Sequence, residues 1–397
     1  MNFSRLATTI VAPIFLFQTL SCQSTEKAPL SPTTPETSAS ASSAGSAAKS
    51  WPVEMQKLME NLTVLMPIIT DPKLYNQPEQ KKLLESKMKE LKTLAHSINA
   101  DTPNPDQDPS LKLIGRRFED NISLSLESFQ SGHIEFSRGV FKNALAQCVQ
   151  CHTRLESGPA LAQPQFLSTL QKVAVVERVQ FLIASRYFDE AMKEIDSALS
   201  QGETLSIVAW QKLVQMGLII NVRFKSDPKK SLEFVTLINN NQHVPFFIKR
   251  QLPFWQQSIK AWVASTKAPV TLRTAQQLVS RAEAAQKISR SEGGAVDYLR
   301  ADGLLHKFLA KSQAPTEKSE ALYQLGMISE NIGEIGAWSM NEDYYELCIR
   351  TQPHSEIAKK CFARYQESTI SGFSGTGGIH IPEDIQKKMN ELRAVAL

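Results

Sequence analysis

Residues 134–152 read IEFSRGVFKNALAQCVQCH. Large apolar residues recur along this segment at a spacing of three or four, which is the period of a helix that buries one face. The residues on that face are Phe136, Val140, Phe141, Leu145 and Val149. We therefore expect a helix over residues 134–152 that ends in a Cys-x-x-Cys-His sequence.

The Cys-x-x-Cys-His sequence, formed by Cys148, Cys151 and His152, is typical of covalent haem attachment. Two thiols at this spacing add to the two vinyl groups of haem, and the adjacent histidine then lies beneath the iron as an axial ligand. A redox-active Cys-x-x-Cys would favour a βαβ context, and a zinc site would need further Cys or His residues at paired spacing. Neither pattern is found in the sequence, so we expect one covalent haem c with His152 as the proximal iron ligand.

Three more amphipathic helices are expected before this segment, over residues 52–69, 79–98 and 110–129. Four helices of similar length with short links predict an up-and-down bundle over residues 51–160. A bundle with Cys-x-x-Cys-His at the end of its fourth helix resembles the cytochrome c-prime superfamily. The resemblance implies a haem site at that end of the bundle, and such relatives often dimerise.

The sixth ligand of the iron is left open by the sequence. In an antiparallel bundle the end of the fourth helix lies beside the start of the first and the end of the second. His133 lies about 28 Å from His152 at 1.5 Å per residue, which excludes it. Met55, on the apolar face of the first helix, matches the place of the methionine ligand in low-spin relatives; Met59 and, less favoured, His96 are the alternatives. Both methionines could instead be core residues, and the iron would then be five-coordinate and open to small gases.

The first fifty residues predict export and a tether. A lone positive charge followed by the apolar stretch 6–20, too short to span a bilayer, indicates a signal peptide over residues 1–21. Its end resembles a bacterial lipoprotein signal, which implies acylation of Cys22; a plain signal peptide is the alternative. Residues 22–50 are rich in Ser, Ala, Thr and Pro and predict a flexible linker. Gln23 favours the outer membrane of a Gram-negative envelope over the inner one.

Residues 165–397 also read as helical, in recurring helix pairs. The stretch 184–199 and the stretch 321–333 resemble tetratricopeptide repeats, although the period is irregular. The expected fold class is therefore all-α, a four-helix bundle followed by a tetratricopeptide-like α-solenoid. Such stacks bind proteins or peptides on a concave face.

The remaining cysteines and glycines give two smaller predictions. Cys348 and Cys361 flank Pro353, so two helices turning there would bring them together as a disulfide in an oxidising compartment. The glycine-rich stretch 372–378 lacks a phosphate-loop pattern and reads as a mobile loop, before a terminal helix that begins near Pro382. Four further histidines have no partners at metal spacing and are expected to be ordinary: His243, His306, His354 and His380.

The composition and the motifs together predict a class of protein. The chain has 397 residues with 44 basic and 40 acidic side chains spread along it, which argues against nucleic-acid binding. No nucleophile or acid–base constellation is present, so no enzyme is expected. We expect a periplasm-facing, lipid-anchored monohaem c-type cytochrome that transfers single electrons to or from a redox protein. The alternatives are a five-coordinate haem that binds or senses gases, and a repeat-based scaffold lipoprotein with a structural haem.

Overall fold

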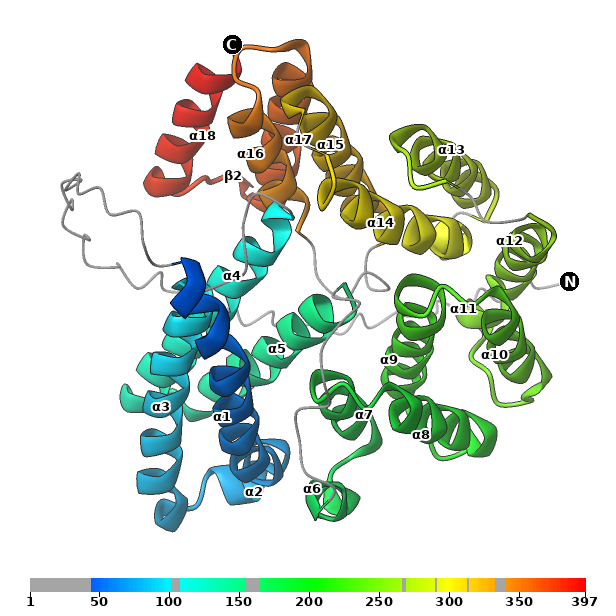
Figure 1. Ribbon diagram of the computed structural model, residues 1–397. Helices are drawn as coiled ribbons and strands as arrows, with labels where there is room; N and C mark the ends of the chain where they lie inside the picture. Colours follow the sequence, from blue (N-terminus) through cyan, green and yellow to red (C-terminus); the bar gives the residue numbers. More distant parts are fainter. Residues whose placement is uncertain are drawn as a thin grey trace, which may run out of the picture. The chain divides into compact units, whose positions relative to one another are not determined.

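The computed structural model describes residues 44–100, 108–154, 165–265, 269–289, 291–312, 314–332 and 340–397. The signal peptide and Cys22 lie outside these residues. The described chain from Ala44 to Leu397 forms one compact unit. It is all-α apart from one short hairpin, as the sequence predicts, and is drawn in Figure 1. None of its described helices is both long and apolar enough to cross a bilayer.

Four long helices make up the first part of the chain. They are α1 (Ala44–Thr70), α3 (Lys81–Ala100), α4 (Pro109–Gln130) and α5 (Ile134–His152), with α2 (Pro72–Tyr75) and the 3₁₀ turn η1 (Pro78–Gln80) between the first two. Each of these long helices packs against the next, and α1 packs against α5. Their predicted apolar faces meet in a shared core that includes Leu62, Met88, Ile122 and Phe141.

The bounds of the four long helices agree with the sequence prediction to within two residues, except at the start of α1; the burial of Phe136 and the short helix α2 also differ from it. The observed α5 has the predicted bounds, but Phe136 in its first turn is 58% exposed instead of buried. The helix α1 begins at Ala44, inside the predicted linker 22–50, because its alanine-rich start favours continuation of a helix. The short helix α2 was not predicted; Asp71 caps it by accepting hydrogen bonds from the N–H groups of Lys73 and Leu74.

The rest of the chain consists of shorter helices. In order they are α6 (Gln165–Thr169), η2 (Leu170–Lys172), α7 (Val175–Ala184), α8 (Phe188–Gln201), α9 (Ile207–Leu218), the π-helical turn η3 (Ile219–Phe224), α10 (Pro228–Asn240), α11 (Phe246–Lys249), α12 (Leu252–Ala264), α13 (Leu272–Ser289), η4 (Glu292–Gly294), α14 (Ala295–Leu309), α15 (Pro315–Asn331), α16 (Asn341–Thr351), α17 (Glu356–Gly372) and α18 (Glu383–Ala396).

Neighbouring helices in this part pack as pairs, among them α7 with α8, α10 with α12, α13 with α14 and α15 with α16. Two glycines allow the closest approaches. A Cβ at Gly217 would lie 2.2 Å from the ring of Phe234, and a Cβ at Gly326 would lie 2.3 Å from the ring of Tyr345. Any larger residue would therefore push these helices apart.

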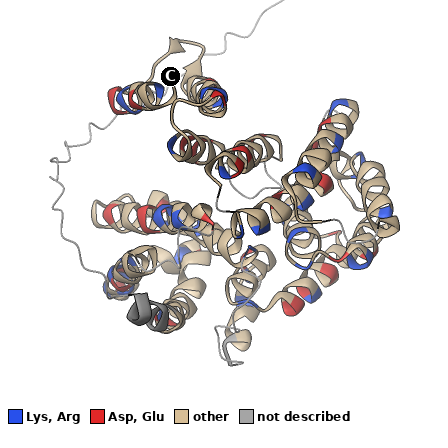
Figure 2. Cartoon of the chain, turned by 45° about the horizontal axis from the view of Figure 1, so that its top comes forward, with Lys and Arg blue, Asp and Glu red and all other residues tan. Residues whose placement is uncertain are grey.

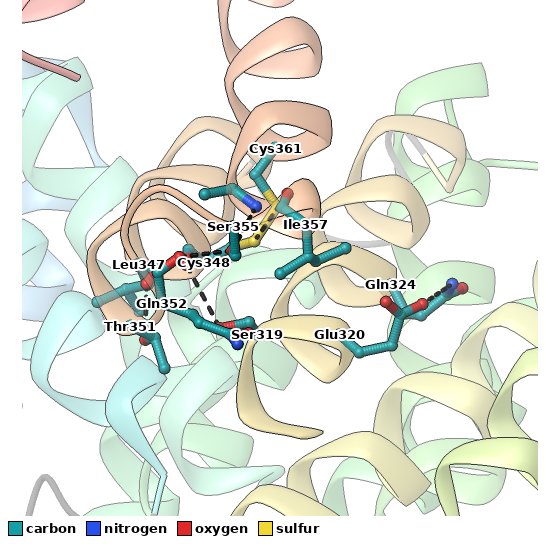
Figure 3. Close-up of a disulfide and its surroundings, with 11 residues drawn as sticks. Ser319, Glu320, Gln324, Leu347, Cys348, Thr351, Gln352, Ser355, Ile357 and Cys361 are labelled. Atoms are coloured by element: carbon teal, nitrogen blue, oxygen red, sulfur yellow. Dashed lines mark hydrogen bonds between the residues drawn. A yellow bond between two sulfur atoms is a disulfide. The ribbon is translucent and has the colours of Figure 1, made fainter. Parts of the chain in front are cut away.

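The disulfide and the terminal hairpin complete the fold. Cys348 on α16 and Cys361 on α17 are bonded, with 6.3 Å between their Cα atoms, and this is the pair that the spacing predicts (Figure 3). The glycine-rich stretch, expected to be a mobile loop, takes part in a short hairpin in which β1 (Ser374–Gly375) and β2 (Gly378–Ile379) pair antiparallel. Gly378, with φ of +108°, supplies the backbone conformation that this tight turn requires.

Contacts join the first four long helices to the later ones. The helix α5 packs against α7, α1 against α6, and α4 against α16. An ion pair between Arg117 of α4 and Asp343 of α16 adds to the last of these contacts. Basic and acidic residues are interspersed along the described helices (Figure 2), in keeping with the balanced composition.

Candidate functional site

The last turn of α5 holds the Cys-x-x-Cys-His sequence in helical geometry. Cys148 and Cys151 are free and half-buried, and His152 is 5% exposed. Thr153 ends the helix: its N–H donates to the carbonyl of Val149, and its hydroxyl donates to the same oxygen at 2.6 Å. Because the two thiols are three positions apart on one helix, both lie on the same side of α5.

An apolar cavity lies against this turn. Apolar side chains make up almost all of its lining, and it is partly open to solvent. Cys148, Cys151 and His152 line it, together with residues of four other helices. These are Met55, Leu58 and Met59 of α1, Ile98 of α3, Leu111, Ile114, Gly115 and Phe118 of α4, and Ala184 of α7; Gln147 of α5 completes the lining.

The two methionine candidates for the sixth ligand line this cavity, and the histidine candidate does not. Met55 is 9% exposed and Met59 is 1% exposed. His96 has a side chain that is 73% exposed, with its Nδ1 atom 2.7 Å from Glu119 Oε1 at the surface. His133 caps the far end of α5, where the sequence places it. The structure therefore brings Met55 together with the Cys-x-x-Cys-His residues but leaves His96 outside.

The environment of His152 keeps its ring neutral. Burial lowers its pKa to about 4, and the positive charge of Arg186 acts in the same direction. The Nδ1 atom of this ring has no hydrogen-bond partner among the described residues, although it is buried. A neutral, buried imidazole with a spare nitrogen is the form in which histidine ligates a metal.

The two thiols are poor nucleophiles as they stand. Burial raises the pKa of Cys148 to about 12 and that of Cys151 to about 11. Thiol–disulfide exchange requires a thiolate, and reactive Cys-x-x-Cys pairs have lowered pKa values instead. The electrostatics of the site therefore disfavour a dithiol oxidoreductase.

The donor set fits a haem better than a bare metal ion. Across the described ranges, no group of three or more His, Cys, Asp or Glu side chains could hold an ion by itself. A haem brings four nitrogen ligands of its own, so a single histidine and one thioether suffice for six-coordinate iron. The apolar lining, the two thiols on one helix side and the unpartnered His152 nitrogen suit such a group.

A buried charged cluster lies next to this turn, and sequence reasoning missed it. It consists of Asp108, Arg154, Arg223, Asp302 and His306, whose side chains are all less than 10% exposed. His306 Nδ1 lies 2.8 Å from Asp108 Oδ2, and its Nε2 lies 3.5 Å from Asp302 Oδ1. Asp302 also faces Arg223 at 3.4 Å and Arg154 at 3.9 Å.

This charged cluster joins distant parts of the chain. Asp108 caps α4 and Arg154 follows α5, whereas Arg223 lies in η3, and Asp302 and His306 lie on α14. Burial disfavours the charged form of His306, but the Asp108 and Asp302 carboxylates outweigh this and raise its pKa. Burial likewise opposes ionisation of Asp302, but His306 and the two arginines hold the pKa of that carboxyl below its usual range.

One signal in the sequence could have indicated this cluster. Asp302 and His306 stand four residues apart on the same face of α14 as the buried Tyr298, Leu305 and Leu309. Charged side chains on an apolar face are rarely buried unless they are paired. The sequence gives His306 no special role; in the structure its ring is buried and lies beside the carboxylates of Asp108 and Asp302.

Comparison with known proteins adds no relative. No family model matches the sequence, and neither a curated protein nor a solved structure is significantly similar to it. The case for a function therefore depends on the residues and geometry of this chain.

Proposed function

We propose that this protein is an exported monohaem c-type cytochrome of the c-prime-like, four-helix-bundle kind, which transfers single electrons. The observation that carries the proposal is the joint lining of one apolar cavity by Cys148, Cys151, His152 and Met55. Cys148 and Cys151 would hold the haem by thioether bonds, and His152 would be the proximal ligand. When bound, such a haem supplies an iron that cycles between the ferrous and ferric states.

The residues around the cavity have defined tasks in this function. The neutral His152 ring is available to the iron without first losing a proton. The thioether of Met55 is the preferred sixth ligand, and a methionine there raises the reduction potential relative to a second histidine. The apolar side chains of Leu58, Ile114 and Phe118 would lower the polarity around the iron, which also favours the less charged, reduced state.

Two features support an exported protein. Haem c is attached outside the cytoplasm, in keeping with the signal peptide predicted over residues 1–21. The Cys348–Cys361 disulfide is typical of an oxidising compartment. We propose that Cys22 is acylated and anchors the protein at the periplasmic side of the outer membrane.

The paired helices from α7 to α17 support a tetratricopeptide-like α-solenoid as the second part of this proposal. Stacks of helix pairs present extended surfaces to proteins or peptides. We propose that this part docks a periplasmic or membrane-bound redox protein, while the first four long helices carry the haem.

The absorption spectrum of the full-length protein, produced with a haem-maturation system, tests the proposal. Covalent haem that survives acid–acetone extraction, with sharp low-spin bands on reduction, is the expected result. A broad high-spin spectrum that shifts with carbon monoxide would favour a five-coordinate gas-binding haem instead. Absence of covalent haem in the wild type, together with its presence in a known cytochrome produced in parallel, would refute the proposal.

Met55→Ala tests the sixth ligand. We expect this variant to keep its covalent haem and to change from a low-spin to a high-spin spectrum. Met66→Ala is the matched control, because Met66 is a fully buried methionine on the same helix that does not line the cavity. Both variants lose about 2–5 kcal/mol of stability, so only the spectrum separates them. A low-spin spectrum in Met55→Ala would exclude Met55, and Met59→Ala would then be the variant to measure.

A further inference from the structure

Arg154 is the least satisfied member of the buried charged cluster. Its side chain is 4% exposed, and its Nε and Nη1 atoms have no hydrogen-bond partner in the described chain. Its ion pair is with Asp302, at 3.9 Å. The Asp302 carboxylate is shared, since Arg223 faces it at 3.4 Å and His306 at 3.5 Å.

The charges in the cluster do not balance when His306 is protonated. Asp108 and Asp302 are two carboxylates, and Arg154, Arg223 and His306 are then three cations. A buried charge without a partner is costly, so such groups are normally paired. Among the described side chains the cluster therefore has one cation more than it has anions, and the nitrogens of Arg154 that lack a described hydrogen-bond partner show where an anion would bind.

Members of the charged cluster are close neighbours in the chain of residues that line the cavity, and their charge acts on one of those residues. Arg154 follows His152 by two residues, and its charge acts on the Cys151 thiol. Thr153, between them, accepts a hydrogen bond from Arg223 of η3. Leu111, which lines the cavity, stands less than one helical turn after the cap residue Asp108.

The haem that we propose carries two carboxylates on an otherwise apolar ring. None of the described residues that line the cavity has a positive charge. A haem carboxylate must therefore reach either solvent or the buried cations beside the cavity. Arginine suits the second role, because its planar guanidinium pairs with a carboxylate through two parallel hydrogen bonds.

We propose that Arg154 binds a carboxylate of the haem and that the buried charged cluster is thereby completed when the haem is loaded. This inference rests on the proposed function, because the haem supplies the anion. Arg223, Asp302 and His306 come from η3 and α14, so the later helices form part of the haem site. The repeat helices then support the haem directly in addition to docking a partner.

The thermal stability of the holoprotein and of a haem-free form, together with the reduction potential of the holoprotein, tests this inference. The haem-free form is the Cys148→Ala/Cys151→Ala chain, purified without the maturation system. In the holoprotein, Arg154→Gln should lower the melting temperature by roughly 3 °C or more. In the haem-free form the same substitution should leave it unchanged or raise it, because it removes a buried charge that has no full partner.

If Arg154 had only a structural role, its replacement would leave the reduction potential unchanged. The potential is therefore the second quantity to measure. Removing the positive charge beside the haem favours the ferric state, so Arg154→Gln should shift the equilibrium at least tenfold towards oxidation, which is 59 mV for one electron. Arg154→Lys keeps the charge and should restore most of the potential. Arg154→Met, which also removes the charge, is the test variant if Arg154→Gln does not fold: a potential and a holoprotein melting temperature both equal to those of the wild type would overturn the assignment.

Arg300→Gln is the matched control. Arg300, on α14, is buried like Arg154, but it pairs with Asp297 at 3.1 Å and lies over the ring of Trp262. Its loss should lower the melting temperature of both forms equally and leave the potential unchanged.

Three results overturn the inference. If Arg154→Gln changes both forms equally and leaves the potential in place, the haem carboxylates bind elsewhere while the proposed function stands. If acetate stabilises the haem-free form only when Arg154 is present, and Arg154→Gln leaves the potential unchanged, the site binds a small free anion. If the wild type contains no covalent haem, the proposed function fails and takes this inference with it.

Discussion

Replacing His152 with glutamine in the haem-free chain is expected to remove a pH dependence of stability that the buried ring causes. Burial lowers the pKa of His152 to about 4, whereas a histidine in the unfolded chain titrates near 6.5. Between pH 6.5 and pH 4 the histidine is therefore protonated in the unfolded state but remains neutral in the folded state. The free energy of unfolding falls as the pH falls from 6.5 to 4, and the fall is complete below the folded pKa.

The size of this effect follows from the shift of about 2.5 pKa units. At 1.36 kcal/mol per unit, the ring contributes about 3 kcal/mol of instability at pH 4 relative to neutral pH. Other groups titrate in the same range, so the quantity to measure is the difference between the wild type and His152→Gln. Urea unfolding followed by circular dichroism, at several values between pH 7 and pH 4, gives this difference directly.

The expected result is that the two haem-free chains converge or cross as the pH falls, with the variant gaining about 3 kcal/mol on the wild type. Curves that stay parallel from pH 7 to pH 4 would refute the buried, neutral state of His152. The holoprotein should lack this dependence, because a ring nitrogen bound to iron is not free to take up a proton.

Three further predictions concern stability. Cys348→Ser/Cys361→Ser should lower the free energy of unfolding by about 3 kcal/mol, the loop-entropy value for a separation of 13 residues, and an unchanged urea midpoint would contradict it. Gly326→Ala should cost about 1–3 kcal/mol, since the added Cβ would lie 2.3 Å from a tyrosine ring of α16; Gly139→Ala, with nothing within 4 Å, is the control and should cost nothing. His306→Gln should have a lower free energy of unfolding than the wild type below pH 6.5, where the protonated ring stabilises the folded state. This difference should disappear as the pH rises through the raised pKa of the folded state. A difference that grows towards alkaline pH in urea titrations would contradict the prediction.

The parts of the fold that were predicted correctly depend on local pattern. The bounds of α5 follow from its apolar period and from the thiols at its end. The placement of Met55 beside His152 follows from helix length and antiparallel packing, both of which can be counted in residues. His96 was retained as a candidate because helix length places it at the right end, whereas its direction is set by the pairing with Glu119 on the neighbouring helix.

The parts that were missed depend on contacts between distant residues. Asp108 and His306 are 198 positions apart, and no spacing rule relates them. The start of α1 at Ala44 was missed because an alanine- and serine-rich segment suits a linker as well as the extension of a helix that packing has already formed. The hairpin near Gly378 was missed because glycine permits a mobile loop and a tight turn equally.

The apolar cavity and the buried charged cluster depend on different parts of the chain. The apolar cavity is built mainly by α1, α4 and α5, so the first four long helices contain most of what positions the thiols and His152. The charged cluster exists only when η3 and α14 pack against the residues that follow α5, because the partners of Asp108 and Arg154 come from there. Without those helices, Asp108 and Arg154 would lose the ion pairs that hold them, and the carbonyls of Ile183 and Ala184 would no longer face the His152 ring. A chain cut after residue 164 should therefore keep its helical content but bind haem with a site open to solvent, which lowers the potential because exposure favours the more charged, ferric state.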